Sequence, residues 1–281
     1  MIDLVLYDVD NTTVPLGAQH APHQVVDAIR GGLDAGLRVG PATGRTSFEL
    51  ERFFEGQDFC YATGVLANGK VVKVDGQVVE KHALPLESIR RAAEIVATFE
   101  GCFTCVYPFD QPQAFGAYVV GSRDPQMLAA YARRQSFEPW PVSQVPDCEI
   151  LSTCIAVPGG QAQVDAVRVA VDEALDDVDV VQPVDAWLDV NAHGVNKATG
   201  FRSLMRILDI RPDQAIFFGD GGNDLQIMAE TPNTAAVANA IPEVAAAARY
   251  HVGACRDFGV AIALRDLAQA RRQGTVATFM R

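Results

Sequence analysis

The chain has 281 residues, 49% of them hydrophobic and 21% charged, so it has ample apolar material for a core and is long enough for one large domain or two smaller ones. Its formal net charge of −12 argues against a nucleic-acid partner, because such binding depends on Lys and Arg side chains that neutralise phosphates. No apolar run approaches the length of a membrane span, and the first residues lack the basic region of a signal peptide, so we expect a cytoplasmic protein with no membrane partner.

Short apolar runs alternate with amphipathic stretches in the first third of the chain. The pattern predicts, in chain order, a strand at 2–7, a helix at 23–35, a strand at 37–43 and a helix at 46–54. A turn at Asn68-Gly69 and a hairpin around Asp75-Gly76 follow. Because strands and helices alternate at short spacing, we expect an α/β fold in which helices cover both faces of a parallel sheet.

The middle of the chain, about residues 82–191, has its own alternation of helices and strands. It predicts helices at 85–99, 124–134 and 160–175, and strands near 102–108, 116–121, 149–158, 178–182 and 186–191. The Pro- and Asp-rich segments FDQPQ and PWPVSQVPD are predicted to be surface loops within this region. We therefore expect a separate two-layer α/β domain at 82–191.

The last third of the chain returns to the pattern of the first. It predicts a helix at 195–210, a strand at 214–220, a helix at 223–230, a short strand within 234–240 and a helix at 242–249. Residues 1–81 and 192–281 are thus expected to form one core domain, into which the middle domain is inserted.

The six cysteines include a C-x-x-C spacing at Cys102 and Cys105, which is a common arrangement in zinc and redox sites. The segment GCFTCVYP is predicted to be a strand, however, and residues three apart on a strand face opposite sides. Cys148 and Cys154 do not form a second closely spaced pair, and no His lies near them in sequence. We therefore predict reduced and mostly buried thiols.

Acidic residues follow two of the predicted strands. LYDVDNT carries Asp8 and Asp10, and IFFGDGGND carries Asp220 and Asp224. Asp is also a common residue where a strand stops, so each segment alone is compatible with a plain strand end. In an open parallel sheet, ligands bind outside the carboxyl ends of the strands. Four carboxylates that converge there would repel one another without a cation, and oxygen-only ligands favour Mg²⁺.

Two further segments bring positive charge to predicted helix starts. VGPATGRTS places Thr43, Gly44 and Arg45 before a helix, and GVNKATG places Lys197 at the start of another. The backbone N–H groups at a helix start favour an anion. Taken singly, Arg45 and Lys197 would be ordinary surface charges. Together, a metal, a hydroxyl, a Lys and an Arg around one crevice predict a phosphoryl group as the ligand.

In this order, the segments DVDNT, ATGR, NK and GDGGND resemble the four motifs of the haloacid dehalogenase superfamily. The detailed pattern resembles the Cof-like type IIB phosphatases of that superfamily, and the likeness extends to ANG at 67–69, VANAIPEV at 237–244 and FGVAIAL at 258–264. The resemblance implies a Rossmann-like core with an inserted α/β cap of the C2 type. A cap that excludes water and bulky substrates favours a small phosphorylated metabolite as the substrate.

The resemblance also implies a role for each matching residue. Asp8 would be the nucleophile that forms an aspartyl-phosphate, and Asp10 would be the general acid and base. Thr43 would hydrogen-bond the phosphoryl oxygens, and Lys197 would neutralise Asp8 and the transferring group. The implied Mg²⁺ ligands are Asp8, the carbonyl of Asp10, Asp220, Asn223 and Asp224. The further implied substrate contacts are Gly44, Arg45 and Asn68, although Asn68 is equally suited to a role in its turn alone.

The sequence departs from the family pattern at Asn11, where the family usually has Gly. Asn is among the few residues that accept a positive φ at modest cost, so we expect the turn to be preserved. The expected activity is that of a phosphatase, and a dehalogenase is disfavoured because its reaction needs neither Asp10 nor a metal. A phosphomutase or phosphotransferase using the same site remains an alternative, as does a non-catalytic sensor of a phosphorylated ligand. Both Asp8 and Asp10 are present, which argues against the sensor.

Overall fold

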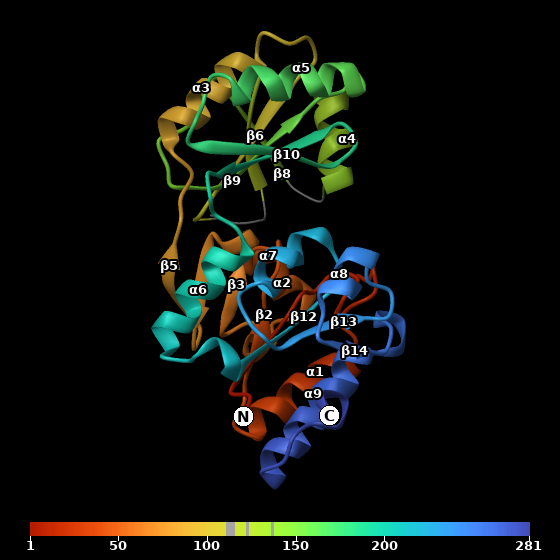
Figure 1. Ribbon diagram of the computed structural model, residues 1–281. Coiled ribbons are helices and arrows are strands. Elements are labelled where there is room, and N and C mark those ends of the chain that lie inside the picture. Colours follow the sequence, from red (N-terminus) through yellow and green to blue (C-terminus); the bar gives the residue numbers. More distant parts are fainter. Residues whose placement is uncertain (111–115, 122–123, 136–137) are drawn as a thin grey trace. The chain divides into compact units, whose positions relative to one another are not determined.

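The computed structural model describes the whole chain except residues 111–115, 122–123 and 136–137. It contains two compact units, which we call the core unit (Met1–Lys81 with Val195–Arg281) and the inserted unit (His82–Gly194). Both units are drawn in Figure 1. The second junction between them falls at 194/195, whereas the sequence analysis placed it at 191/192. Over the part of the chain that is described, no helix is both long enough and apolar enough to cross a bilayer.

A five-stranded sheet forms the centre of the core unit, and all of its strands are parallel. Its order is β14 (Tyr250–Val252), β13 (Thr234–Val237), β12 (Ala215–Gly219), β1 (Leu4–Tyr7) and β2 (Arg38–Pro41). Every side chain of β1 and β12 is buried, as is usual where helices cover both faces of a parallel sheet. The predicted α/β fold with a parallel sheet is therefore confirmed.

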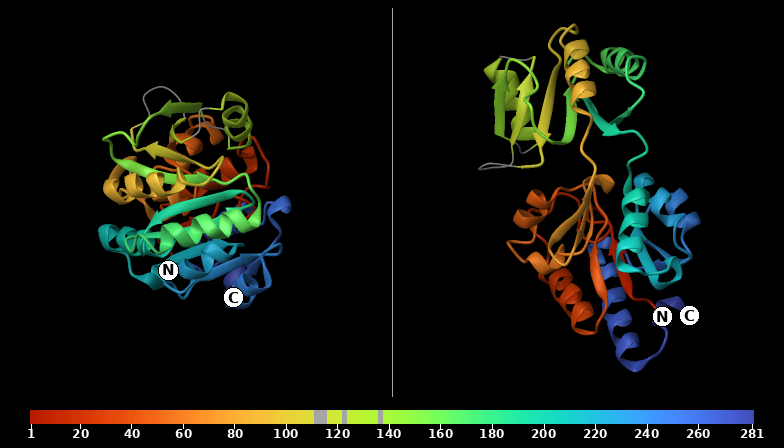
Figure 2. Two further views of the ribbon diagram at one scale, coloured as in Figure 1. Left: turned by 90° about the horizontal axis from the view of Figure 1, so that it is seen from above. Right: turned by 90° about the vertical axis from the view of Figure 1, so that its left-hand side faces the viewer.

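Helices cover both faces of this sheet. The helices of the core unit are α1 (His23–Asp34), α2 (Ser47–Phe53), α6 (Lys197–Leu208), α7 (Leu225–Met228), α8 (Pro242–Ala247) and α9 (Gly259–Gln273). Helices α1 and α9 pack side by side (Figures 1 and 2), while α6, α7 and α8 share a cluster with Leu4 and Leu6 of β1. The predicted helix at 223–230 is shorter than expected, because a 3-10 turn at Gly222–Asp224 precedes α7.

A small antiparallel sheet of β3 (Gly64–Leu66), β4 (Val71–Val74) and β5 (Gln77–Lys81) completes the core unit. The hairpin predicted at Asp75-Gly76 joins β4 and β5, and both residues have the positive φ that a tight hairpin requires. In the turn after β3, Gly69 has a φ of 94°, and a Cβ there would lie 1.9 Å from the carbonyl oxygen of Asn196. Only Gly allows this contact, which brings the start of α6 against the turn.

The inserted unit has a six-stranded sheet that is antiparallel except for one pair. Its order is β10 (Val178–Val184), β11 (Trp187–Ala192), β9 (Ile150–Ala156), β6 (Phe103–Pro108), β7 (Gly116–Val120) and β8 (Glu138–Val142). Helices α3 (Leu86–Val96) and α5 (Gln161–Asp172) pack on one face. Helix α4 (Pro125–Gln135) packs on the other face. The unit therefore has three layers, whereas the sequence predicted two.

Strand β8 corrects the first part of the prediction that PWPVSQVPD is a loop, while residues 143–147 lie outside any strand or helix as predicted. Residues Glu138–Val142 form an edge strand parallel to β7, although Pro139 and Pro141 lie within it. Pro is tolerated at a sheet edge because its missing N–H can face away from the neighbouring strand. Trp140 fixes the strand in place, since its ring lies 5.3 Å from that of Tyr118 and covers Gly116 closely. Part of the other predicted loop, FDQPQ, lies outside the described residues.

The C-x-x-C cysteines lie on opposite faces of the inserted sheet. Cys102 belongs to the cluster beneath α3 and α5, whereas Cys105 belongs to the cluster beneath α4. All six cysteines are free thiols, and only Cys148 among them is partly exposed. The prediction that the thiols are mostly buried is therefore confirmed, and their reduced state stays a prediction.

Candidate active site

Asp8 is the first residue after β1, at the carboxyl end of the sheet. Its backbone N–H donates to the carbonyl of Phe218 at 2.9 Å, which extends the pairing of β1 with β12 by one residue. Its carbonyl accepts a hydrogen bond from the Thr13 hydroxyl at 2.7 Å. The Asp8 side chain is only 11% exposed, so its carboxylate is held rigidly in a largely desolvated position.

Lys197 is the first residue of α6 and the cation that faces Asp8. The side chain of Asn196 caps this helix by accepting from the N–H groups of Ala198 and Thr199. The Lys197 ammonium is buried and donates to Asp8 Oδ1 and Asp224 Oδ1, both at 2.6 Å. Burial acts to lower the pKa of Lys197, but the two carboxylates outweigh it and the pKa is raised, so the ammonium is charged.

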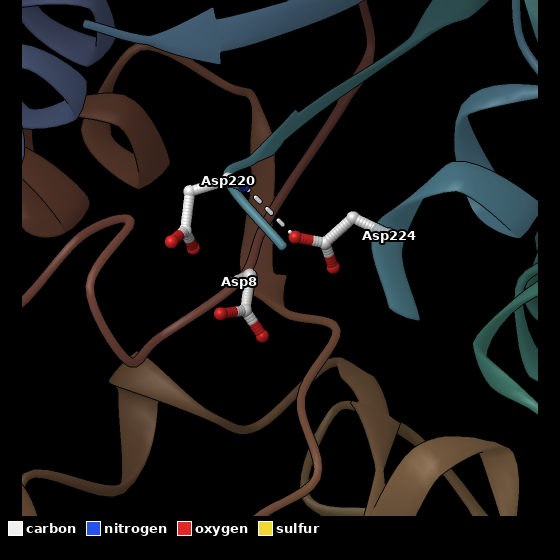
Figure 3. A group of neighbouring side chains, drawn as sticks. All are labelled: Asp8, Asp220 and Asp224. Atoms are coloured by element: carbon white, nitrogen blue, oxygen red, sulfur yellow. Dashed lines mark hydrogen bonds between the residues drawn. The ribbon is translucent and has the colours of Figure 1, made fainter. Parts of the chain in front are cut away.

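Asp220 follows β12, and Asp224 closes the turn after it. Asp224 Oδ2 accepts the backbone N–H groups of Asp220 and Gly221 at 2.9 and 3.1 Å. Gly219 is needed here, because a Cβ would lie 2.6 Å from Asp224 Oδ2. Figure 3 shows the carboxylates of Asp8, Asp220 and Asp224 gathered together, with one oxygen of each within 4.8 Å of the others.

Asp10 and Arg45 form a two-bond ion pair. Arg45 donates from Nε and Nη2 to the two oxygens of Asp10, at 2.8 and 2.6 Å. The guanidinium also lies over the ring of Phe53, 4.3 Å from its centroid, which is a favourable cation–π geometry. The bonds to Asp10 raise the pKa of Arg45. The pair therefore fixes Asp10 from the start of α2.

Backbone bonds hold the loops of Thr43 and Asn68 together. Asn68 donates its backbone N–H to the carbonyl of Thr43, and Ala67 donates to that of Arg45, both at 2.9 Å. The side chain of Asn68 covers Gly44, where a Cβ would lie 3.2 Å from Nδ2. Asn68 has a φ of 54°, and its buried Oδ1 has no hydrogen-bond partner among the described residues. Asn68 thus forms the turn and also reaches the site, whereas the sequence left these two roles as alternatives.

These side chains line an open cleft of about 330 Å³ in the core unit. Its lining residues are Asp8, Asp10, Thr43, Gly44, Arg45, Glu49, Asn68, Asp220, Gly221 and Asn223. Lys197 and Asp224 are not in the lining; Lys197 contacts it through Asp8, and Asp224 contacts it through the backbone N–H groups of Asp220 and Gly221. Glu49 was missed by the sequence analysis, although the capping-box pattern that it forms with Thr46 was a signal for its position.

The site has more negative charge than its own cations neutralise. Burial raises the pKa of Asp8 to about 7, with Lys197 opposing the rise and Asp224 adding to it. Burial also raises the pKa of Asp220, against hydrogen bonds from Thr12 and Asn11 that lower it. Mg²⁺ binds oxygen ligands, and its charge would offset the repulsion between these clustered carboxylates. The residues present therefore fit the ion that the sequence predicted.

We expect the metal-free protein to lose stability as the pH rises from about 4 to 7. In the unfolded chain Asp8 has its usual pKa of 3.8, and in the folded chain its pKa is about 7. Protonated Asp8 therefore stabilises the folded state fully below pH 3.8, and this stabilisation is lost as the pH rises through about 7. The free energy of unfolding falls by as much as ~4 kcal/mol over the whole range. Urea unfolding in chelator at pH 5 and pH 8 measures the part of this loss that falls above pH 5, about 3 kcal/mol. The Asp8→Asn protein should show a smaller difference, and identical differences for both proteins would contradict this assignment.

The parallel α/β core, its strand-end carboxylates and the inserted α/β unit define a class of hydrolase. A family model for haloacid dehalogenase-like hydrolases matches residues 5–264, and the chain belongs to this family. The family prediction made from the four motifs is therefore confirmed.

Individual relatives agree with this membership. The 5-amino-6-(5-phospho-D-ribitylamino)uracil phosphatase YbjI of Escherichia coli is 36% identical over 95 residues, which are 34% of this chain and 35% of that protein. The match thus spans about a third of that relative. A phosphatase of the same superfamily, BT1666 from Bacteroides thetaiotaomicron, has a TM-score of 0.76 at 22% identity and covers 95% of both chains. The subclass IIB sugar phosphatase BT4131 has a TM-score of 0.72 at 21% identity over 94% of this chain and 98% of its own. At these identities the two structures show a shared fold.

Proposed function

We propose that the protein is a Mg²⁺-dependent phosphatase that hydrolyses a small phosphorylated metabolite through an aspartyl-phosphate on Asp8. The observation that carries this proposal is the state of the Asp8 carboxylate in the cleft. Lys197 binds its Oδ1, while Oδ2 has no donor among the described residues. One oxygen is thus neutralised and the other is free to attack. The names of the relatives as phosphatases support the same reaction.

In the proposed reaction, Asp8 Oδ2 attacks the phosphorus and the bond from phosphorus to the substrate oxygen breaks. Asp10 gives its proton to the leaving alkoxide. Asp10 then takes a proton from a water molecule, which attacks the phosphorus of the aspartyl-phosphate. Phosphate leaves, and Asp8 is a carboxylate again. Lys197 stays beside Asp8 throughout and offsets the charge that develops on the transferring group.

The pair of Asp10 and Arg45 suggests how the acid is made ready. A guanidinium binds a phosphoryl group with the same two-bond geometry that it uses for a carboxylate. In the proposal, the substrate phosphoryl group therefore competes with Asp10 for Arg45, and Asp10 is released to carry a proton. Thr43 and the backbone at Gly44 lie in the same cleft and would hold the remaining phosphoryl oxygens.

The proposed Mg²⁺ ligands are the side chains of Asp8, Asp220 and Asn223 and the carbonyl of Asp10. Asp224 belongs to the same carboxylate group, but Lys197 and two backbone N–H groups already bind its oxygens. We assign it to hold Lys197 and the turn, with any contribution to the ion made through water. When bound, the ion would neutralise the carboxylates and draw charge from the phosphoryl oxygens.

The proposed substrate is a sugar phosphate or a similar phosphorylated metabolite. BT4131 is described as a sugar phosphatase, and YbjI is named as the phosphatase of a phosphorylated ribityl compound. Both kinds of molecule carry hydroxyl groups next to a terminal phosphate. The free thiols are in keeping with the proposed location in the cytoplasm, where thiols stay reduced.

We expect phosphate release to require Mg²⁺. Removing the ion with a chelator leaves the carboxylates uncompensated, so release should fall to background and return when Mg²⁺ is added in excess. The measurement is free phosphate from a panel of sugar phosphates and 5-amino-6-(5-phospho-D-ribitylamino)uracil, with chelated protein as the control. Isomer formation without free phosphate would favour a mutase, and binding without turnover would favour a sensor. Either result would overturn the proposal of a phosphatase.

A further inference from the structure

Asn11 lies in the turn that follows Asp10, and the backbone conformation of this turn does not require an Asn side chain. Asn11 has a φ of 61°, and its backbone N–H donates to the carbonyl of Val14 at 2.8 Å. The positive φ that was expected is thus present, and Gly would adopt it without strain. The φ therefore permits Asn without requiring it, and any role of the amide must come from the contacts that it makes.

That side chain contacts Asp220, which lies 209 residues later in the chain. Asn11 Nδ2 donates to Asp220 Oδ2 at 2.5 Å, and the Thr12 hydroxyl donates to Asp220 Oδ1. A carboxylate only accepts hydrogen bonds, so the amide must present its nitrogen here. Each oxygen still has a second lone pair for a metal ion. The two bonds therefore fix the orientation of the carboxylate and leave it able to bind.

The turn is itself anchored from the second core segment. The carbonyl of Asn11 accepts from Asn239 Nδ2 at 2.8 Å, and Asn239 Oδ1 accepts from the N–H of Cys255 at 2.7 Å. The carbonyl of Asp220 accepts from the N–H of Ile241 at 3.0 Å. Asn11 and Asp220 are thus both fixed by the short stretch 239–241, which sets the distance between them.

We propose that Asn11 is a positioning residue for the metal, and that it raises the affinity of the site for Mg²⁺ by holding Asp220 in its binding orientation. This inference depends on the proposed Mg²⁺ site. Partners that orient a ligand contribute about 10- to 100-fold in metal affinity in other proteins. A ligand that is already oriented loses less conformational entropy when the ion binds. The same contact could instead lower the affinity for Mg²⁺, if the amide competes with the ion for the Asp220 carboxylate.

Calorimetric titration of the metal-free protein with Mg²⁺ alone separates these cases. The Asn11→Gly protein keeps the permitted φ and loses only the amide, so we expect its Kd for Mg²⁺ to rise about tenfold. Asp209→Gly is the matched control, because Asp209 has a φ of 52° at the end of α6 and is not in the cleft lining. Its Kd should stay within about twofold of the wild type, since it makes no contact with a proposed ligand.

The direction of the change decides the outcome. An unchanged or lower Kd in the Asn11→Gly protein would overturn the positioning role, and a lower Kd would favour competition. If the wild-type protein itself does not bind Mg²⁺, the proposed metal site fails, which is a different result from equal binding by both proteins. Thermal melting of the metal-free proteins checks that each variant is folded, because Gly at these positions should change stability little.

Discussion

Replacement of Asp8 by Asn should lower the kcat for phosphate release by at least about 10⁴-fold. The amide is nearly the same size as the carboxylate but cannot attack phosphorus, and loss of a nucleophile commonly costs a factor of this order or larger. The bond from Lys197 to Oδ1 can still form with the amide oxygen, so the protein should fold. The measurement is kcat for the best substrate of the panel, with Mg²⁺ in excess.

The matched control for this prediction is Asp3→Asn. Asp3 lies just before β1, at the end opposite to Asp8, and pairs with Arg271. Its substitution removes the same charge and should leave kcat within about twofold of the wild type, because partly exposed pairs contribute little. Activity of the Asp8→Asn protein above about 1% of the wild type would argue against a covalent step on Asp8. Acid quenching of wild-type turnover should in addition trap phosphate on the protein.

Replacement of Lys197 by Met should lower the free energy of unfolding of the metal-free protein by about 3–5 kcal/mol at pH 8. Met has a similar length and no charge. Its presence leaves Asp8 and Asp224 buried without the cation that binds both of them in the described structure. The loss should be smaller at pH 5, where a proton can neutralise a buried carboxylate. Urea unfolding in chelator at both pH values gives the comparison.

Arg202→Met provides the control on the same helix. Arg202 is 54% exposed and pairs with Glu230, so its loss should cost less than about 1 kcal/mol. Equal destabilisation by the two substitutions would show that the burial of Lys197 has no special consequence. Addition of Mg²⁺ should recover part of the stability of the Lys197→Met protein, because the ion replaces some of the missing positive charge.

Local pattern was sufficient to predict most of the fold. The apolar runs at β1, β2 and β12 and the spacing of α1 and α6 lie within single elements, where periodicity is informative. Strand β8 was missed because its two prolines favour a loop when read locally. Its pairing with β7 and the packing of Trp140 on Gly116 are decided by tertiary contacts.

The site was predictable only in part, for a similar reason. Strand-end carboxylates and helix-start cations are local signals, and the structure brings Asp8, Lys197 and Asp220 together. The hydrogen bond from Asn11 to Asp220 joins residues from the two core segments, and no local pattern contains it. The burial of Asp224 beneath Lys197 likewise depends on where α6 packs.

The central pairing of the core sheet has a consequence for biosynthesis. Leu4 of β1 pairs with Ala215 of β12, so one side of β1 finds its partner only after most of the chain has been made. At about 5–20 residues per second, this interval is roughly 10–40 seconds. During that time β1 is the edge of an incomplete sheet, and its free backbone groups can pair with other chains. We therefore expect the nascent chain to be prone to aggregation, and slower initiation or chaperone supply should improve the yield of the protein.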